Sequence, residues 1–136
     1  MTSSKPYLAR IDVDLRLHLT PPLANLRAHI RLLLSDAGTD CVEDVELLAT
    51  ELVSNAYDHG VRPLSARLWR ADRRKLVRVE VDDANPAHLP ILGLSRFGTN
   101  RGRGLIMVDQ LAQHWGSAVR SWGKTIWAEV ACPSIA

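Results

Sequence analysis

The sequence predicts an α+β fold, a two-layer α/β sandwich in which helices cover one face of a mixed, mostly antiparallel sheet. Segments with apolar residues at every second position alternate with segments of helical period, in the order strand, helix, helix, strand, strand, loop, helix, strand, strand. The chain has 136 residues, 46% hydrophobic and 24% charged, which is ordinary for one globular domain. We therefore expect one domain over residues 1–136, with residues 1–7 as a tail.

Residues 10–20 are expected to form the first strand, and a helix follows it. Apolar residues occupy each odd position of this segment and polar residues each even one, the period of a strand with one buried face. Pro21 and Pro22 end the strand and open the helix, because proline is tolerated in the first turn of a helix. Leucine and isoleucine then recur at helical spacing until Gly38, which closes this helix.

A second helix is expected from about residue 41 to residue 58. Thr39 and Asp40 can cap its start, with Glu43 at capping-box distance from Asp40, and Gly60 stops it. The later elements are expected as strands at 64–71 and 76–83, a long loop at 84–101, a helix from 105 to about Trp115-Gly116, and a closing hairpin of strands at 117–121 and 124–131. A loop of this length inside a compact domain is usually either a functional lid or a disordered segment.

Composition excludes several classes of protein. A net charge of +2 and a pI near 8.8 do not indicate a nucleic-acid-binding protein. The sequence contains no apolar run long enough for a membrane span and no apolar core of a signal peptide near residue 1. Cys41 and Cys132 lie far apart without CxxC spacing, which argues against a disulfide and against a zinc site. These observations together predict a cytoplasmic protein with reduced cysteines.

Three polar side chains share one face of the second expected helix. Glu51, Asn55 and His59 are spaced four residues apart, so they line one wall while the opposite face is apolar. A carboxylate and a carboxamide one turn apart are oxygen donors that suit Mg²⁺ and a nucleophilic water or hydroxyl. Such residues are equally common on a solvated helix face, and this pattern alone does not decide between the two interpretations.

Asp83 ends an otherwise apolar strand and falls on its apolar face, as do Val77, Val79 and Val81. A carboxylate there needs a partner or a ligand. One interpretation is a turn-initiating aspartate that binds its own backbone. The other is a buried acceptor for an exocyclic amine, at the floor of an apolar pocket.

The glycine-rich segment at 98–105 precedes the third expected helix. Glycines before a helix free backbone N–H groups to face an anion, and Arg101 and Arg103 add positive charge. A flexible loop would have the same composition. Together, these features give an oxygen-donor helix face for Mg²⁺, a carboxylate in an apolar pocket and a phosphate-binding loop under a lid.

These motifs resemble those of the gyrase/histidine-kinase-like ATP-binding fold, the Bergerat-type fold. Glu-Leu-Val-x-Asn-Ala-x-x-His-Gly at 51–60 resembles the family's N-box, Val-Glu-Val-Asp-Asp-Ala-Asn-Pro at 79–86 its first glycine box, and Gly-Arg-Gly-Leu at 102–105 its second. The similarity is greatest to small, single-domain bacterial anti-sigma-factor serine/threonine kinases. One departure is that no glycine follows Asp83, where the family usually reads Asp-x-Gly-x-Gly.

The resemblance implies ATP and Mg²⁺ as cofactors and a role for each matched residue. Glu51 is expected to be the general base, Asn55 the Mg²⁺ ligand and Asp83 the acceptor of the adenine amino group. The remaining nucleotide-binding residues implied by the resemblance are His59, Arg101, Gly102, Arg103, Gly104, Leu105 and Thr125.

The implied activity is phosphorylation of a serine or threonine on an anti-sigma-factor antagonist, sequestration of a sigma factor, or both. We hypothesise that the first strand lies at a sheet edge, where it would serve a homodimer or a partner. A non-catalytic protein-binding module, dependent on ATP or not, is the alternative. Direct binding of nucleic acid is not expected, because no surface of interleaved basic and aromatic residues is visible.

Overall fold

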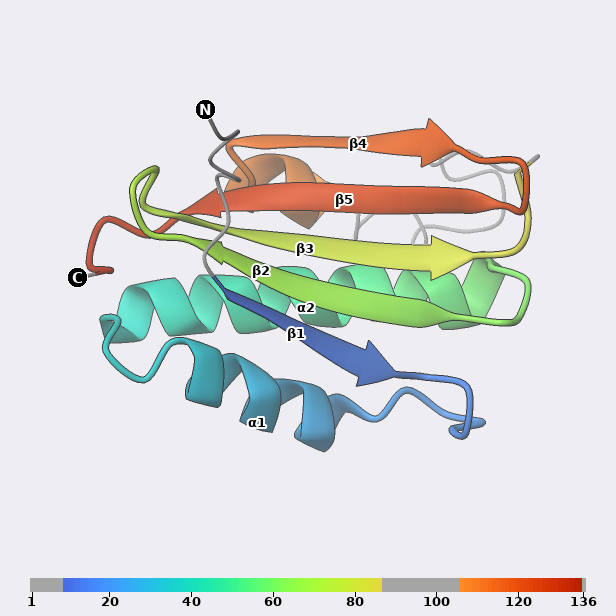
Figure 1. Ribbon diagram of the computed structural model, residues 1–136, viewed down its shortest axis with the longest axis horizontal. Coiled ribbons are helices and arrows are strands. Elements are labelled where there is room, and N and C mark those ends of the chain that lie inside the picture. The colour runs from blue at the N-terminus through green and yellow to red at the C-terminus, as the bar shows by residue number, and fades with distance from the viewer. Residues whose placement is uncertain (1–8, 87–105, 136) are drawn as a thin grey trace, which may run out of the picture.

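The computed structural model describes residues 9–86 and 106–135, which form two layers (Figure 1). One layer is a five-stranded sheet, and the helices lie together on one of its faces. The predicted α+β class is therefore confirmed. The strand pairs of this sheet are antiparallel throughout the described residues, so the mixed pairing that we expected is not found there. The expected tail and residues 87–101 of the expected lid lie outside the described residues.

The elements follow the predicted order. They are β1 (Ala9–Asp14), α1 (Leu23–Leu33), α2 (Thr39–His59), β2 (Ser65–Ala71), β3 (Leu76–Asp83), β4 (His114–Val119) and β5 (Lys124–Ala131). Residues 106–111, just before β4, are also helical. The strands lie in the order β1-β2-β3-β5-β4, which confirms that the first strand lies at a sheet edge.

One apolar core joins the two layers. Val77, Val79 and Val81 of β3 are at most 2% exposed and face the helices, because successive residues of a strand point to opposite faces. Helix α2 packs a stripe of buried residues onto this face of the sheet: Cys41, Val45, Leu48, Ala49, Leu52, Val53 and Ala56. The exposed residues of α2, such as Glu43 and Asp58, lie outside this stripe, as expected for an amphipathic helix.

The first strand is shorter than predicted, since β1 ends at Asp14 and not near residue 20. In the register of β1 with β2, Arg16 would stand opposite Pro63, which has no N–H to donate to a ladder. The backbone N–H of Arg16 instead donates to the Asp14 carboxylate over 2.9 Å, which turns the chain away from the sheet. Leu17 and Leu19, predicted to be buried, are 86% and 89% exposed.

The predicted helix boundaries need three corrections. Helix α1 ends at Leu33, and Gly38 is the N-cap of α2 rather than the end of α1. No side chain caps α2 there, so the predicted capping box at Asp40 is wrong; Asp40 lies in the first turn, where its charge suits the helix dipole. The third helix ends at Leu111, because β4 begins at His114 and pairs with β5.

Cys41 and Cys132 form a disulfide, which contradicts the expectation of free thiols. They are 91 residues apart in sequence, yet the first turn of α2 lies beside the segment that follows β5. The backbone N–H of Gly38 also donates to the hydroxyl of Ser134 over 2.8 Å, which joins the same two segments. Distance along the sequence gave no sign of this contact, because it depends on how the helix packs against the end of the sheet.

Reduction of the disulfide should lower the free energy of unfolding by about 2–4 kcal/mol, because it opens a long closed loop. The measurement is urea unfolding followed by circular dichroism, with and without dithiothreitol. A Cys41→Ala/Cys132→Ala double variant is the control, and its midpoint should not respond to the reductant. If dithiothreitol does not change the unfolding midpoint of the wild type, the disulfide is contradicted.

Replacement of Gly123 by alanine should destabilise the β4–β5 turn. A Cβ atom at this position would lie 2.0 Å from the carbonyl oxygen of Asp83 and 2.7 Å from the Cα of Ala84, so backbone would have to move. We expect a loss of about 3 kcal/mol in the free energy of unfolding. Ser121→Ala, an exposed change in the same turn, should leave the unfolding midpoint within error.

Candidate functional site

Glu51, Asn55 and His59 lie in the second half of α2, as predicted. All three are partly buried, at the margin of the buried stripe of the helix. Glu46 of the same helix forms an ion pair with Arg31 of α1, which marks the flank of α2 that faces α1. Asn55 follows nine residues later, about 180° around the helix, so it lies on the opposite flank.

This flank of α2 faces the side of the molecule where residues 106–111 lie (Figure 1). Glu51 shares it, because it lies about 40° around the helix from Asn55. Burial raises the pKa of Glu51 above its usual value, since loss of solvent disfavours the ionised carboxylate. A carboxylate with a raised pKa is a stronger base. The helix thus presents a carboxyl group and an amide one turn apart on one wall.

Asp83 ends β3 on the face that carries the helices, and it is only 3% exposed. The end of α2 lies directly against it: a Cβ atom on Gly60 would come within 2.8 Å of the Cβ of Asp83. The N–H of Val61 donates to Oδ1 of Asp83 over 3.4 Å, and the N–H of Ala84 donates to the Val61 carbonyl over 2.7 Å. The structure therefore brings the end of the helical motif beside Asp83.

Lys124 is the partner of Asp83. It begins β5, stands opposite Asp83 in the strand register and is only 4% exposed. Its Nζ lies 2.9 Å from Oδ2 of Asp83 and donates to the carbonyl of Asn85 over 2.8 Å. The N–H of Asn85 in turn donates to Oδ1 of Asp83 over 2.8 Å. The interpretation of Asp83 as a turn residue is thus supported, since it binds its own turn. Asp83 also has the partner that a buried carboxylate needs, which is Lys124.

Thr125 does not lie beside Asp83. It follows Lys124 in β5, so its side chain points to the face of the sheet without helices. There its hydroxyl donates to Oδ1 of Asp82 over 2.7 Å. Burial by itself raises the pKa of Asp82, but hydrogen bonds from Arg67, Thr125 and Ser65 outweigh it and lower the pKa. Thr125 therefore belongs to a charged network on the opposite face of the sheet.

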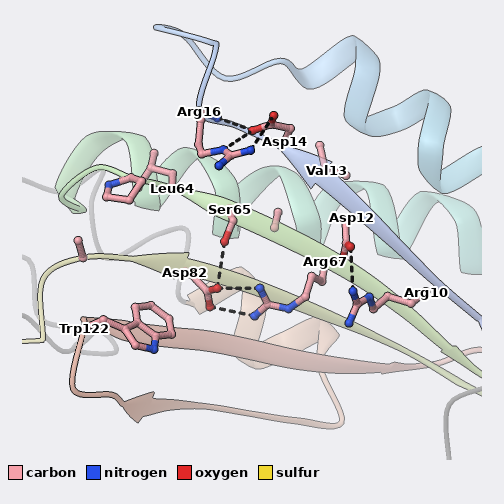
Figure 2. Close-up of a pocket in the computed structure, with 13 residues that line it drawn as sticks. Arg10, Asp12, Val13, Asp14, Arg16, Leu64, Ser65, Arg67, Asp82 and Trp122 are labelled. Carbon is pink, nitrogen blue, oxygen red and sulfur yellow. Dashed lines mark hydrogen bonds and ion pairs between the residues drawn. The ribbon is translucent and has the colours of Figure 1, made fainter.

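That face carries a hollow of about 900 Å³ beside β1, β2 and β3 (Figure 2). Arg67 lies along its floor and forms a two-pronged ion pair with Asp82, at 2.7 and 2.9 Å. Figure 2 shows the other two labelled arginines turned toward neighbouring carboxylates as well, and the ion pairs join Arg10 to Asp12 and Arg16 to Asp14. Paired charges of both signs do not favour an anion such as a nucleotide here.

The glycine-rich segment cannot be placed relative to α2 and β3, since Arg101, Gly102, Arg103, Gly104 and Leu105 lie outside the described residues. Within the described ranges, no group of three or more His, Cys, Asp or Glu side chains could hold a metal ion. A site in which one amide and the phosphates share Mg²⁺ does not need such a group. None of the described helices is long and apolar enough to cross a membrane.

Lys124 is the site residue that the sequence analysis missed. The same reasoning that singled out Asp83 applies to it, because it occupies the apolar face of a strand that continues with Ile126, Ala128 and Val130. A buried lysine at such a position calls for a carboxylate partner. The antiparallel pairing of β3 with β5 identifies Asp83 as that partner.

Comparisons with solved structures show the fold. The chain is similar to a structure of the RsbU and RsbW domains of a Mycobacterium tuberculosis protein, with a TM-score of 0.65 and 19% identity over 92% of this chain. This chain spans 33% of that one. A histidine kinase domain from the blue-light activated histidine kinase of Erythrobacter litoralis also matches, with a TM-score of 0.48 and 15% identity, over 96% of this chain and 66% of the other.

Sequence comparison supplies the family. No curated protein matches the chain. The family model described as the histidine kinase-like ATPase domain matches residues 18–129, which include α2, β3 and nearly all of β5. Glu51, Asn55, Asp83 and Lys124 all fall within that match. The chain belongs to the histidine kinase-like ATPase domain family.

Proposed function

We propose that this protein binds Mg-ATP between α2 and the end of β3 and acts as a cytoplasmic regulator of the anti-sigma-factor kinase type. The observation that carries the proposal is the junction of α2 with Asp83, in a chain of an ATPase family. It places a buried acceptor next to a helix that carries a base and an amide. The phosphorylated group would be a serine or threonine of an anti-sigma-factor antagonist.

The Asp83 carboxylate retains capacity for a nucleobase. A carboxylate offers about four acceptor positions. Asn85 and Val61 donate to Oδ1, and Lys124 pairs with Oδ2. One position remains for the exocyclic amino group of adenine. The donor set therefore fits the base that the family motif implies.

The α2 wall suits the triphosphate end of the nucleotide. Asn55 would hold the magnesium ion through its amide oxygen, and the ion would neutralise charge on the phosphates. His59 and the segment from Arg101 to Leu105 would contact the nucleotide beside it. Backbone N–H groups at the start of a helix favour anions, which suits the segment before residues 106–111.

Glu51 would act on the hydroxyl of the partner. Its raised pKa allows the carboxylate to accept the hydroxyl proton as the oxygen attacks the γ-phosphorus atom. The bond from that phosphorus to the bridging oxygen then breaks, and ADP leaves with the electron pair. Positioning of the hydroxyl and the phosphate would contribute most of the rate.

The partner side of the proposal rests on the motif resemblance and on the exposed edge strand. A mycobacterial structure that contains an RsbW domain shares the fold, which is consistent with a regulator of this type. Strand β1 lies at the edge of the sheet, where a second copy of the chain or a partner could add a strand. Sequestration of a sigma factor would use such a surface without phosphotransfer.

A non-catalytic protein-binding module is the second candidate, and one observation favours it. Lys124, the N–H of Asn85 in the turn after Asp83 and the N–H of Val61 already occupy three of the positions on the Asp83 carboxylate, and that turn contains no glycine. Weak binding or slow turnover would follow if this arrangement resists the nucleotide. The protein would then bind its partner without chemistry.

Calorimetric titration with Mg-ATP tests nucleotide binding. Wild type should bind, and Asp83→Asn should bind about 10- to 100-fold more weakly, because it replaces a charged acceptor with a neutral one. Thermal melting of both proteins checks that the variant is folded. Absence of binding by wild type would remove the nucleotide proposal, and equal binding would remove Asp83 from the base site.

Glu51→Gln should reduce phosphotransfer by at least about 100-fold and leave Mg-ATP binding nearly unchanged. The assay follows labelled γ-phosphate into a candidate antagonist protein, with Glu43→Gln, an exposed change on the same helix, as the control. The wild-type rate should rise with pH as Glu51 loses its proton, at a pH above the usual glutamate pKa.

The same variant should not be less stable at pH 7. A group whose pKa is raised in the folded state favours folding below its unfolded pKa and loses this contribution as the pH rises through the folded pKa. At neutral pH the ionised Glu51 therefore makes no favourable contribution to stability that Glu51→Gln could remove. Full phosphotransfer by Glu51→Gln would refute the base, and a wild type that binds the antagonist but transfers no phosphate would support the module.

A further inference from the structure

Lys124 and Asp83 form a buried ion pair at the ends of two paired strands. Both side chains lie on the helix-facing side of the sheet and are 4% and 3% exposed. A lysine is almost never this buried unless it is paired. The pair adds little to stability by itself, because the loss of solvation offsets most of the attraction. Its position beside the proposed base site suggests another role.

The ammonium group closes a ring of hydrogen bonds around the turn that follows β3. It contacts Oδ2 of Asp83 and the carbonyl of Asn85, while the N–H of Asn85 donates to Oδ1 of Asp83. Each oxygen of the Asp83 carboxylate is therefore held in place by a donor. The ring fixes a turn that contains Ala84 and Pro86 and no glycine. Loss of the lysine would free the carboxylate and the turn together.

We propose that Lys124 is a positioning residue that sets nucleobase selectivity, by holding Asp83 as a carboxylate that can only accept hydrogen bonds. This inference rests on the proposed function, since it concerns the base of the bound nucleotide. A fixed acceptor favours a purine with an amino group at C6, which donates. It disfavours a 6-oxopurine, whose oxygen at the same position is also an acceptor and would face the carboxylate.

The selectivity depends on the lysine because its ammonium group is the partner of Oδ2 of Asp83. Without this cation, the carboxylate is free to turn and the turn after β3 loses its contact with position 124. The acceptor that distinguishes an amino group from an oxygen at C6 of the purine is then no longer fixed. Removal of the charge at position 124 should therefore weaken ATP binding and improve binding of ITP relative to ATP.

The experiment measures the dissociation constants of Mg-ATP and Mg-ITP for wild type, Lys124→Met and Val119→Ala by calorimetry. Val119 stands opposite Lys124 on β4 and is 60% exposed, so its truncation is the matched control. Wild type and Val119→Ala should prefer ATP by at least about tenfold, and this preference should fall at least about tenfold in Lys124→Met. A merely structural lysine would weaken both nucleotides equally.

Thermal melting shows whether each variant is folded. If Lys124→Met does not fold, the comparison uses Lys124→Gln, which keeps N–H donors for the turn but removes the charge; the same loss of preference is expected. A folded variant that binds ATP with the wild-type preference over ITP would overturn the inference and leave the proposed function intact. A wild type that binds neither nucleotide would overturn both.

Discussion

The packing of α2 against the sheet is the constraint on which the candidate site depends. Its stripe of buried residues fixes how the helix is rotated, and this rotation leaves Glu51 and Asn55 on the flank away from α1. The same packing carries the end of the helix to the end of β3, where Gly60 leaves room for Asp83. A helix that packed one residue out of register would turn both polar side chains about 100° around its axis. Core packing therefore determines the geometry of the site.

Close backbone contacts also determine how Asp83 is enclosed at the end of β3. A Cβ atom on Gly60 or Gly123 would collide with Asp83, so glycine on both neighbours allows α2 and the β4–β5 turn to approach the aspartate. Burial at this depth requires a partner for the carboxylate, and Lys124 supplies the charge. The buried pair is thus a consequence of the tight junction. Because the pair lies at the ends of β3 and β5, the carboxylate that the tight packing buries is also the one at the proposed nucleotide site.

Periodicity was sufficient for the order of the elements and for the faces of β3 and α2, because each element buries one face and the sequence repeats accordingly. It failed where contacts between distant residues decide the outcome. The alternation through Leu17 and Leu19 continues past β1, yet the ladder ends at the pair of Asp14 with Ser65, and Pro63 precedes the neighbouring strand. The disulfide joins residues 91 positions apart. Motif resemblance predicts Thr125 at the nucleotide site, whereas its side chain binds Asp82 on the opposite face of the sheet, because neighbouring residues of a strand point to opposite faces.

The two faces of the sheet use buried charge in different ways. On the face of the sheet opposite the described helices, Arg67 pairs with both Asp82 and Glu80 in one network. Such a network has little capacity left for a ligand. On the helical face, the Asp83 carboxylate keeps an acceptor position, and the helix beside it carries Glu51 and Asn55. The spare hydrogen-bonding capacity of Asp83 beside the partly buried Glu51, rather than the number of charges or the size of a hollow, distinguishes the candidate site from its surroundings.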